Sequence, residues 1–204
     1  MTGWTGADQA GRRPFWPEVF EARDGRMVAI RPVTLDDAAE SVAIVRQAAE
    51  EGIYLLVEPE MVRTAEEQRE YLRQLHPDDL FLVTEVDGHV VGQVDAYRGR
   101  WGKIRHTADI GLVIAQDYRN LGIGRRLLQA VDRWARESGL LKLSLGVFSS
   151  NDRAIHLYRG CGFQVEGVRS RHLYVHGQFV DELIMAKFLE PDEAPPGNGQ
   201  TTQP

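Results

Sequence analysis

A glycine-rich stretch near the middle of the chain, "YRNLGIGRRLL" at residues 118–128, restricts the fold more than any other feature. It follows the strand-like run "TADIGLVIA", and after Gly124 the apolar residues keep a helical period. The stretch therefore joins a strand to a helix N-terminus, where free backbone N–H groups and the helix dipole attract anions. Gly122 and Gly124 let the backbone approach a ligand closely. Three arginines are spaced to add charge-assisted hydrogen bonds: Arg119, Arg125 and Arg126. This pattern favours a pyrophosphate.

Two common phosphate motifs do not fit this stretch. No Gly-Lys-Ser/Thr follows the glycines, and Leu127 stands where a dinucleotide fingerprint has its third glycine. The stretch also comes after three consecutive strand candidates, whereas a Rossmann loop opens a βαβ unit. Taken alone, it is equally compatible with a flexible turn before a helix.

Length and charge exclude several classes of protein. A chain of 204 residues with 43% hydrophobic residues is sufficient for one globular domain. The net charge of −6 argues against nucleic-acid or anionic-membrane partners. Cys161 is the single cysteine, so neither a disulfide framework nor a cysteine metal site is expected. We find no apolar leader and no long apolar run, and expect a cytoplasmic protein without a metal.

Turn and capping signals divide the chain into elements. Thr34-x-x-Asp37 and Thr64-x-x-Glu67 predict two helix starts, and Asp87-Gly88 predicts a hairpin turn. The full order is strand, two helices, three strands, helix, strand, helix and two strands. We predict an α/β domain at residues 26–190, an extension at 1–25 outside the core, and a disordered tail at 191–204.

A second motif makes the glycine stretch more specific. The run "NDRAIHLYRGCGF" at residues 151–163 lies about one helix and one strand after it. Together with Arg119-x-x-Gly122-x-Gly124, this run resembles the signatures of the GCN5-related N-acetyltransferase (GNAT) superfamily, over residues 26–189. Within that superfamily, the chain is most similar to the bacterial branch of amino-acid and phosphinothricin-type acetyltransferases. The resemblance implies a mixed, mostly antiparallel sheet of seven strands, splayed around acetyl-CoA and flanked by about four helices.

The resemblance also implies where acetyl-CoA binds. Backbone N–H groups from Leu121 to Arg126 would hold the pyrophosphate, and the pantetheine arm would lie along the strand before the loop. A backbone N–H near Val113 would polarise the thioester carbonyl. The implied cofactor residues are Leu112, Val113, Ile114, Arg119, Asn120, Leu121, Gly122, Ile123, Gly124, Arg125, Arg126, Asn151, Ala154 and Tyr158.

Candidate catalytic groups follow from the same resemblance. Tyr158 would protonate the leaving thiolate, although it is also explained as a packing residue. Asn151 would reach the pantetheine or serve only as a helix cap. Transfer needs a neutral amine, so a base is expected: Asp109 first, then Glu85, with strand register undetermined. His106 is explained better as an exposed histidine at a strand end.

The acceptor is expected to be the primary amine of a small molecule such as an amino acid. Glu50, Tyr54 and Glu58 would meet its ammonium group, and a solvated acidic face explains the same residues. The alternatives are a protein N-terminal or lysine acetyltransferase, or a non-catalytic CoA sensor. A homodimer is compatible with the resemblance. Cys161 has no histidine beside it in sequence, so we expect direct transfer without a covalent enzyme intermediate.

Overall fold

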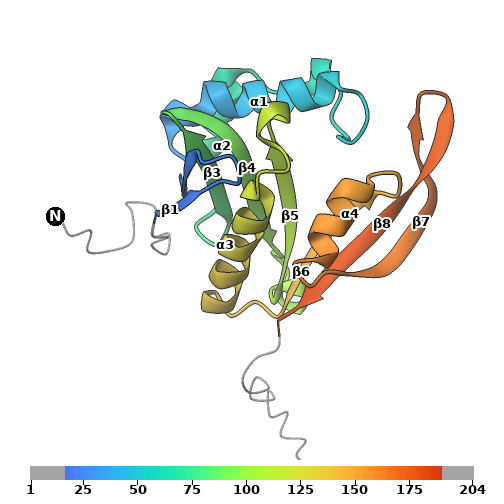
Figure 1. Cartoon of the computed structure of the whole chain (residues 1–204). Helices are drawn as coiled ribbons and strands as arrows, with labels where there is room; N and C mark the ends of the chain where they lie inside the picture. Colours follow the sequence, from blue (N-terminus) through green and yellow to red (C-terminus); the bar gives the residue numbers. More distant parts are fainter. Residues whose placement is uncertain (1–16, 190–204) are drawn as a thin grey trace, which may run out of the picture.

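The computed structural model describes residues 17–189, which form one eight-stranded sheet with four α-helices (Figure 1). The strands are β1 (Glu18–Glu21), β2 (Met27–Pro32), β3 (Leu80–Val86), β4 (His89–Arg98), β5 (Thr107–Ile114), β6 (Lys142–Phe148), β7 (Gln164–Val175) and β8 (Gln178–Phe188). The helices are α1 (Ala38–Glu50), α2 (Ala65–Arg73), α3 (Ile123–Glu137) and α4 (Asp152–Arg159). The spatial order is β1-β2-β3-β4-β5-β6-β8-β7. This confirms the mixed, mostly antiparallel class.

The sheet has one strand more than the seven predicted. β1 pairs with β2 inside the segment that was expected to lie outside the core. Phe20 packs against the main core and Ala22 is buried in it. A four-residue strand with glutamates at both ends is too short for its alternation to be recognised in sequence. The predicted tail at 191–204 lies outside the described residues.

Local sequence signals set several boundaries as predicted. Thr64 and Glu67 form a reciprocal capping box at the start of α2. The Thr34 box opens a short 3-10 turn, and α1 starts directly after it at Ala38. Asp87 and Gly88 both have positive φ, as a two-residue hairpin between β3 and β4 requires. These turns fix the pairing of β3 with β4 and the attachment of both helices.

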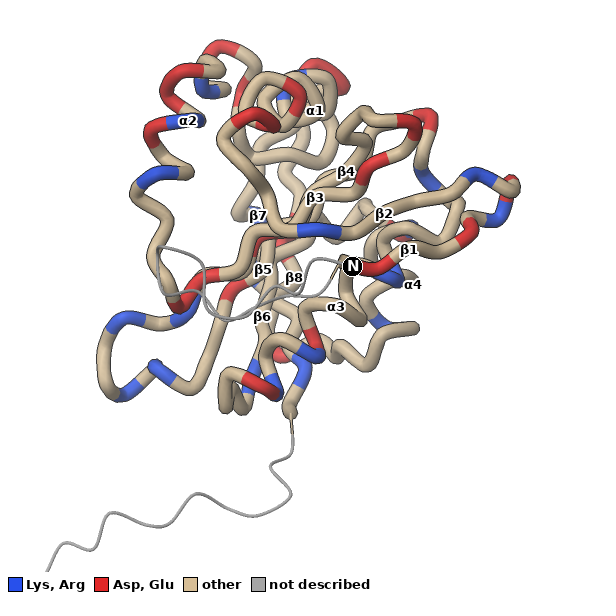
Figure 2. The backbone as a smooth tube through the Cα atoms, turned by 90° about the vertical axis from the view of Figure 1, so that its left-hand side faces the viewer, with Lys and Arg blue, Asp and Glu red and all other residues tan. Residues whose placement is uncertain are grey.

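Helices cover both faces of the sheet, as strand alternation dictates. On β3, Leu80 and Leu82 belong to the main core together with α3, whereas Phe81 and Val83 pack with α1 and α2. The apolar face of α3 is buried along its whole length. Charged residues of both signs occur along α2 (Figure 2). The first half of the sheet is therefore a closed sandwich.

The sheet opens between its two central strands. β5 and β6 form the one parallel pair, and their pairing runs only from Thr107–Lys142 to Asp109–Ser144. Beyond Asp109, β5 stays paired with β4 up to Ile114, while β6 stays paired with β8 up to Phe148. The predicted splay is thus present, and α4 lies on the β6 side of the opening (Figure 1).

Candidate functional site

A cleft of about 820 Å³ lies at this opening. Its walls come from α1 with the loop that follows it, from β4 and β5, from the glycine stretch, and from β6 with α4. The splay therefore brings together segments that lie more than a hundred residues apart in the chain. Most of the predicted cofactor residues line it: Leu112, Val113, Ile114, Arg119, Asn120, Gly122, Gly124, Arg125, Asn151, Ala154 and Tyr158.

The glycine stretch forms the start of α3. Gly122 is the N-cap residue with φ of 91°, a conformation that favours glycine. Gly124 lies so close to its neighbours that an added Cβ would stand 2.9 Å from Leu157 Cδ2. The backbone conformation therefore favours glycine at 122, and close packing against Leu157 of α4 favours a residue without a side chain at 124.

Three of the predicted cofactor residues do not line the cleft. Ile123 is buried in the core and Leu121 packs against it. The Arg126 guanidinium lies over the Phe20 ring at 5.3 Å. The Arg126 side chain therefore does not line the cleft, because the helix period turns position 126 toward Phe20 on β1.

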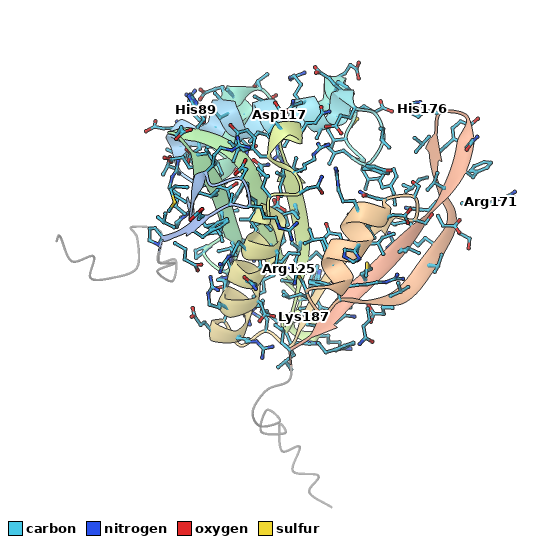
Figure 3. All side chains as sticks on the ribbon, viewed as in Figure 1. His89, Asp117, Arg125, Arg171, His176 and Lys187 are labelled. Atoms are coloured by element: carbon cyan, nitrogen blue, oxygen red, sulfur yellow. The ribbon has the colours of Figure 1, made fainter. Side chains whose placement is uncertain are left out.

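The other two arginines of the motif are already engaged. Arg119 donates from Nη1 to Glu51 Oε2 at 2.7 Å and from Nε to the Ile114 carbonyl at 2.9 Å. Arg125 donates to the Gly160 carbonyl at 2.7 Å and lies between α3 and α4 (Figure 3). Arg119 thus fixes the glycine stretch to the end of β5 and of α1.

The phase of the β4–β5 ladder determines which groups of β5 face the opening. The Ala115 N–H donates to the Val91 carbonyl on β4. Because alternate residues of an antiparallel strand bond to the same neighbour, the N–H groups of Leu112 and Ile114 point away from β4. The Ile114 carbonyl, which accepts from Arg119, follows the same phase. The open edge therefore presents Leu112 and Ile114, the two residues beside the predicted Val113.

Tyr158 and Asn151 occupy the α4 side of the cleft. The Tyr158 side chain is 8% exposed and its ring lies 5.9 Å from that of Phe163. Burial, with a smaller effect from Cys161, raises the pKa of Tyr158 to about 12. No described residue hydrogen-bonds to its hydroxyl. Asn151 Oδ1 accepts from the Ala154 N–H at 3.1 Å, so it caps α4.

The two predicted bases lie elsewhere. Asp109 is exposed at the last β5–β6 pair, where Ser144 donates to it at 2.6 Å. Glu85 on β3 pairs with Arg31 on β2 at 2.8 Å. Neither side chain lines the cleft. The geometry does not support either as the base, because β5 and β6 are still paired at Asp109 and Glu85 belongs to an ion pair with β2.

One of the three predicted acceptor residues lines the cleft, and the other two do not. Tyr54 lines the cleft, where its hydroxyl donates to the Ser150 carbonyl at 3.1 Å and its ring contacts Phe148 edge-on. Glu50 and Glu58 are exposed and do not line the cleft. These two residues correspond to the solvated acidic face that was the alternative explanation.

A carboxylate that the sequence analysis missed lies in the cleft wall. Asp95, on β4, stands directly opposite Gly111 on β5, and its carboxylate occupies the space that a side chain at 111 would take. Burial raises the pKa of Asp95 above its ordinary value, against the lowering effect of a hydrogen bond from Tyr97. A lone acid in the apolar run "VVGQVDAY" was the available signal, but the cross-strand glycine could not be paired with it without the register.

Two tyrosines connect Asp95 to the rim of the cleft. The Tyr97 hydroxyl donates to Asp95 Oδ2 at 2.8 Å and lies 2.5 Å from the Tyr71 hydroxyl on α2. Burial, followed by the Asp95 charge, raises the pKa of Tyr97, so both phenols stay protonated at neutral pH. The result is a hydrogen-bonded chain from a partly buried acid to the surface.

A second acid lines the opposite wall. Glu182 on β8 has 8% of its side chain exposed and fills the space beside Gly146 on β6. Arg169 pairs with it at 2.9 Å and His172 lies 3.6 Å away. The charge of Glu182 is thus balanced within the β7–β8 hairpin, whereas Asp95 accepts from the neutral phenol of Tyr97.

Other kinds of site find no support in the part of the chain that the structure describes. Between residues 17 and 189, no helix has the length and apolar character that a membrane crossing needs. Within the same range, no group of three or more histidine, cysteine or acidic side chains could hold a metal ion. Cys161 is partly buried at the end of α4, and burial raises the pKa of its thiol.

Comparison with known proteins identifies the family. The model of the acetyltransferase (GNAT) family matches residues 45–163. An N-alpha-acetyltransferase of Sulfurisphaera tokodaii is 32% identical over 83% of this chain and 98% of its own. The L-amino acid N-acetyltransferase AaaT of Escherichia coli is 30% identical over 52% of this chain, which spans 66% of AaaT. A crystal structure of a GNAT-family acetyltransferase from Streptococcus pneumoniae superposes with a TM-score of 0.75 at 30% identity, covering 80% of this chain and 99% of the other. With the splayed sheet and the glycine stretch at its mouth, these matches establish that the chain belongs to the GNAT family of acetyltransferases.

Proposed function

We propose that this protein transfers the acetyl group of acetyl-CoA directly to the primary amine of a small molecule, with amino acids as the acceptor class. The observation that carries the proposal is the cleft at the β5–β6 splay, with an anion-binding helix start at one end and Asp95 at the other. The similarity of this chain to the L-amino acid N-acetyltransferase AaaT supports this acceptor class.

The residues of the cleft fit acetyl-CoA. Gly122 and Gly124 bring the backbone of the α3 start close to a bound pyrophosphate, where N–H groups and the helix dipole stabilise its charge. The open edge of β5 offers the pantetheine amides a strand to pair with. In this arrangement, the N–H of Leu112 or Ile114 polarises the thioester carbonyl, because these groups face the opening.

Asp95 is the general base of this proposal. It accepts a proton from the acceptor ammonium, and the neutral amine nitrogen then attacks the thioester carbon. The raised pKa of Asp95 brings the carboxyl closer to the pH at which it exchanges protons efficiently. The Tyr97–Tyr71 chain holds the carboxylate in place and connects it to solvent.

Tyr158 is the proposed acid. When the tetrahedral intermediate collapses, the C–S bond breaks and the Tyr158 hydroxyl protonates the leaving sulfur, giving CoA thiol. The nitrogen loses its second proton, which restores the Tyr158 phenol through solvent, and the proton on Asp95 passes to solvent, leaving the N-acetylated product. With its pKa at about 12, the phenol is fully protonated at neutral pH and has no competing partner among the described residues. The partly buried thiol of Cys161 lies outside the cleft, which favours direct transfer.

A protein N-terminus is the second candidate acceptor. The match to the N-alpha-acetyltransferase of S. tokodaii covers 98% of that relative's length. The rim residues Leu56 and Met61 are exposed enough to contact a peptide.

The proposal also includes a cytoplasmic location for the protein, since the chain's single cysteine suits a reducing compartment.

Release of CoA thiol from acetyl-CoA tests the function. The purified protein is assayed with amino acids, polyamines, aminoglycosides and N-terminal peptides, and acetyl-CoA binding is measured separately by calorimetry. We expect thiol release that depends on amino acids. Release with peptides alone would favour the second candidate. Binding without release for any acceptor would indicate a sensor, and the absence of binding would contradict the acetyl-CoA assignment.

A further inference from the structure

The acceptor end of the cleft holds one cation that the proposed chemistry does not use. Arg63, between the loop after α1 and the start of α2, lines the cleft together with Tyr71, Asp95 and Tyr97. Its guanidinium lies 4.2 Å from the centre of the Tyr71 ring. The other cleft arginines belong to the glycine stretch, to α4, or to the loop between β1 and β2, where Arg23 donates to the Asn120 carbonyl.

Arg63 is available to a ligand. Its one direct hydrogen bond to a described residue runs from Nη1 to Gln68 Oε1 at 3.3 Å, near the weak limit for such a bond. Among residues 17–189, no carboxylate lies within ion-pair distance of it, whereas Arg119 at the other end is paired with Glu51. A planar guanidinium stacked on a tyrosine keeps its donor edge free for a carboxylate.

The segment that carries Arg63 is held in position. Arg46 on α1 donates from Nη1 to the Pro59 carbonyl at 3.0 Å and from Nη2 to the Val62 carbonyl at 3.4 Å. Val62 is buried, and the Thr64 capping box fixes the chain on the other side of Arg63. The backbone at Arg63 is therefore anchored on both sides, while its side chain extends to the rim.

Arg63 is also linked to the proposed base. It stacks on Tyr71, whose hydroxyl contacts that of Tyr97, which in turn donates to Asp95. An acceptor that gives its amine proton to Asp95 therefore has a cation next to the rest of its polar head. The surrounding wall is apolar, from Leu55, Leu56, Val57 and Met61.

From this arrangement we infer that Arg63 binds the α-carboxylate of the acceptor and thereby selects free amino acids with apolar side chains over peptide N-termini and polyamines. The inference rests on the proposed acetyl transfer and names its substrate class. A peptide N-terminus has an amide where the amino acid has a carboxylate, and a polyamine would bring a second cation toward the guanidinium. Both lack the group that Arg63 is placed to bind.

The test compares leucine with leucinamide, which differ in the carboxylate alone, and includes spermidine. For the unaltered protein we expect kcat/KM for leucine to exceed that for leucinamide by about 10- to 100-fold, the range of a charge-assisted hydrogen bond. Arg63→Gln should lower kcat/KM for leucine by a similar factor, mainly through KM, and leave leucinamide unchanged. Arg63→Lys should recover part of the preference, because lysine keeps the charge without the planar fork.

Arg69→Gln is the matched control, since Arg69 lies on α2, six residues after Arg63, pairs with Glu66 and does not line the cleft. Acetyl-CoA affinity and the melting temperature of each variant show that it is folded. Equal kcat/KM for leucine and leucinamide, or an equal loss for both in Arg63→Gln, would overturn the carboxylate assignment while leaving acetyl transfer intact. No thiol release with any acceptor would overturn the proposed function, and this inference with it.

Discussion

The Asp95 carboxylate occupies the space that a side chain at Gly111 would need, because the two residues are direct partners in the β4–β5 pairing. This contact lets an acid stand in the wall of the cleft beside the open edge of β5. A similar contact places Glu182 beside Gly146 on the other wall. The two glycines make room for the acids, and the loss of either one displaces a carboxylate.

Gly111→Ala is expected to displace Asp95 and lower kcat by at least about tenfold, since a small misplacement of a catalytic group is costly. The overpacking should lower stability by about 1–3 kcal/mol. Gly102→Ala is the control, because an added Cβ there meets nothing within 4 Å. Steady-state kinetics and thermal melts of both variants provide the comparison, and an unchanged kcat in Gly111→Ala would show that the position of Asp95 does not matter.

Asp95→Asn should lower kcat/KM by about 10²- to 10⁴-fold, the usual contribution of a general base. In the unaltered protein, kcat/KM should rise with pH through the raised pKa of Asp95, and the variant should lose that limb. Measurements of kcat/KM between pH 5 and 9 check this prediction. If the rise of kcat/KM with pH persists in the variant, another group is the base.

The same substitution should raise the melting temperature at neutral pH. The pKa of Asp95 is higher in the folded chain than in the unfolded chain, so the folded protein binds the proton more tightly. Below the pKa that Asp95 has in the unfolded chain, the carboxyl is protonated in both states and its ionisation costs no folding stability. As pH rises through the pKa of the folded chain, ionisation of Asp95 lowers the free energy of unfolding. Thermal melts at acidic and neutral pH should show a gain for Asp95→Asn that grows with pH, and a loss at neutral pH would contradict the assignment.

Tyr158→Phe should lower kcat by about 10- to 100-fold and leave acetyl-CoA binding unchanged, because it removes a proton donor and keeps the ring. The phenol has no hydrogen-bond partner among the described residues, so folding should not depend on its hydroxyl. Calorimetric binding and single-turnover rates separate the two effects. Weaker acetyl-CoA binding at an unchanged rate would assign Tyr158 to the cofactor site alone.

Gly122→Ala should raise KM for acetyl-CoA. A φ of 91° costs a residue with a side chain about 1–2 kcal/mol, so the start of α3 should shift away from the bound pyrophosphate. Nothing lies within 4 Å of the added Cβ, so the effect is conformational and not steric. KM for the amine should stay constant, and a change in both constants would point to a wider rearrangement.

Glu85→Gln and Asp109→Asn should keep the rate of the unaltered protein, because neither side chain lines the cleft. Glu85→Gln removes one of the two carboxylates paired with Arg31 and should cost at most about 1 kcal/mol, as expected of a partly exposed ion pair. A large loss of rate in either variant would restore it as a candidate base.

The sequence by itself determined the elements whose signals are local. The capping box at Thr64, the turn at Asp87-Gly88 and the glycine stretch before α3 each depend on neighbouring residues, and the structure confirms them. The two spaced motifs also identified the family, because they set the glycine-rich start of α3 and α4 at the required separation.

Tertiary structure alone decided which charged groups meet in the cleft. Asp95 and Gly111 are paired by strand register, and one residue of slippage would turn Asp95 to the other face of the sheet. At Asp109, β5 is still paired with β6, and Glu85 belongs to an ion pair with Arg31 on β2. Neither side chain therefore lines the cleft. Tyr71 on α2 meets Tyr97 on β4 only in the folded chain. These relationships join residues that are distant in sequence, and backbone pairing and side-chain packing determine them.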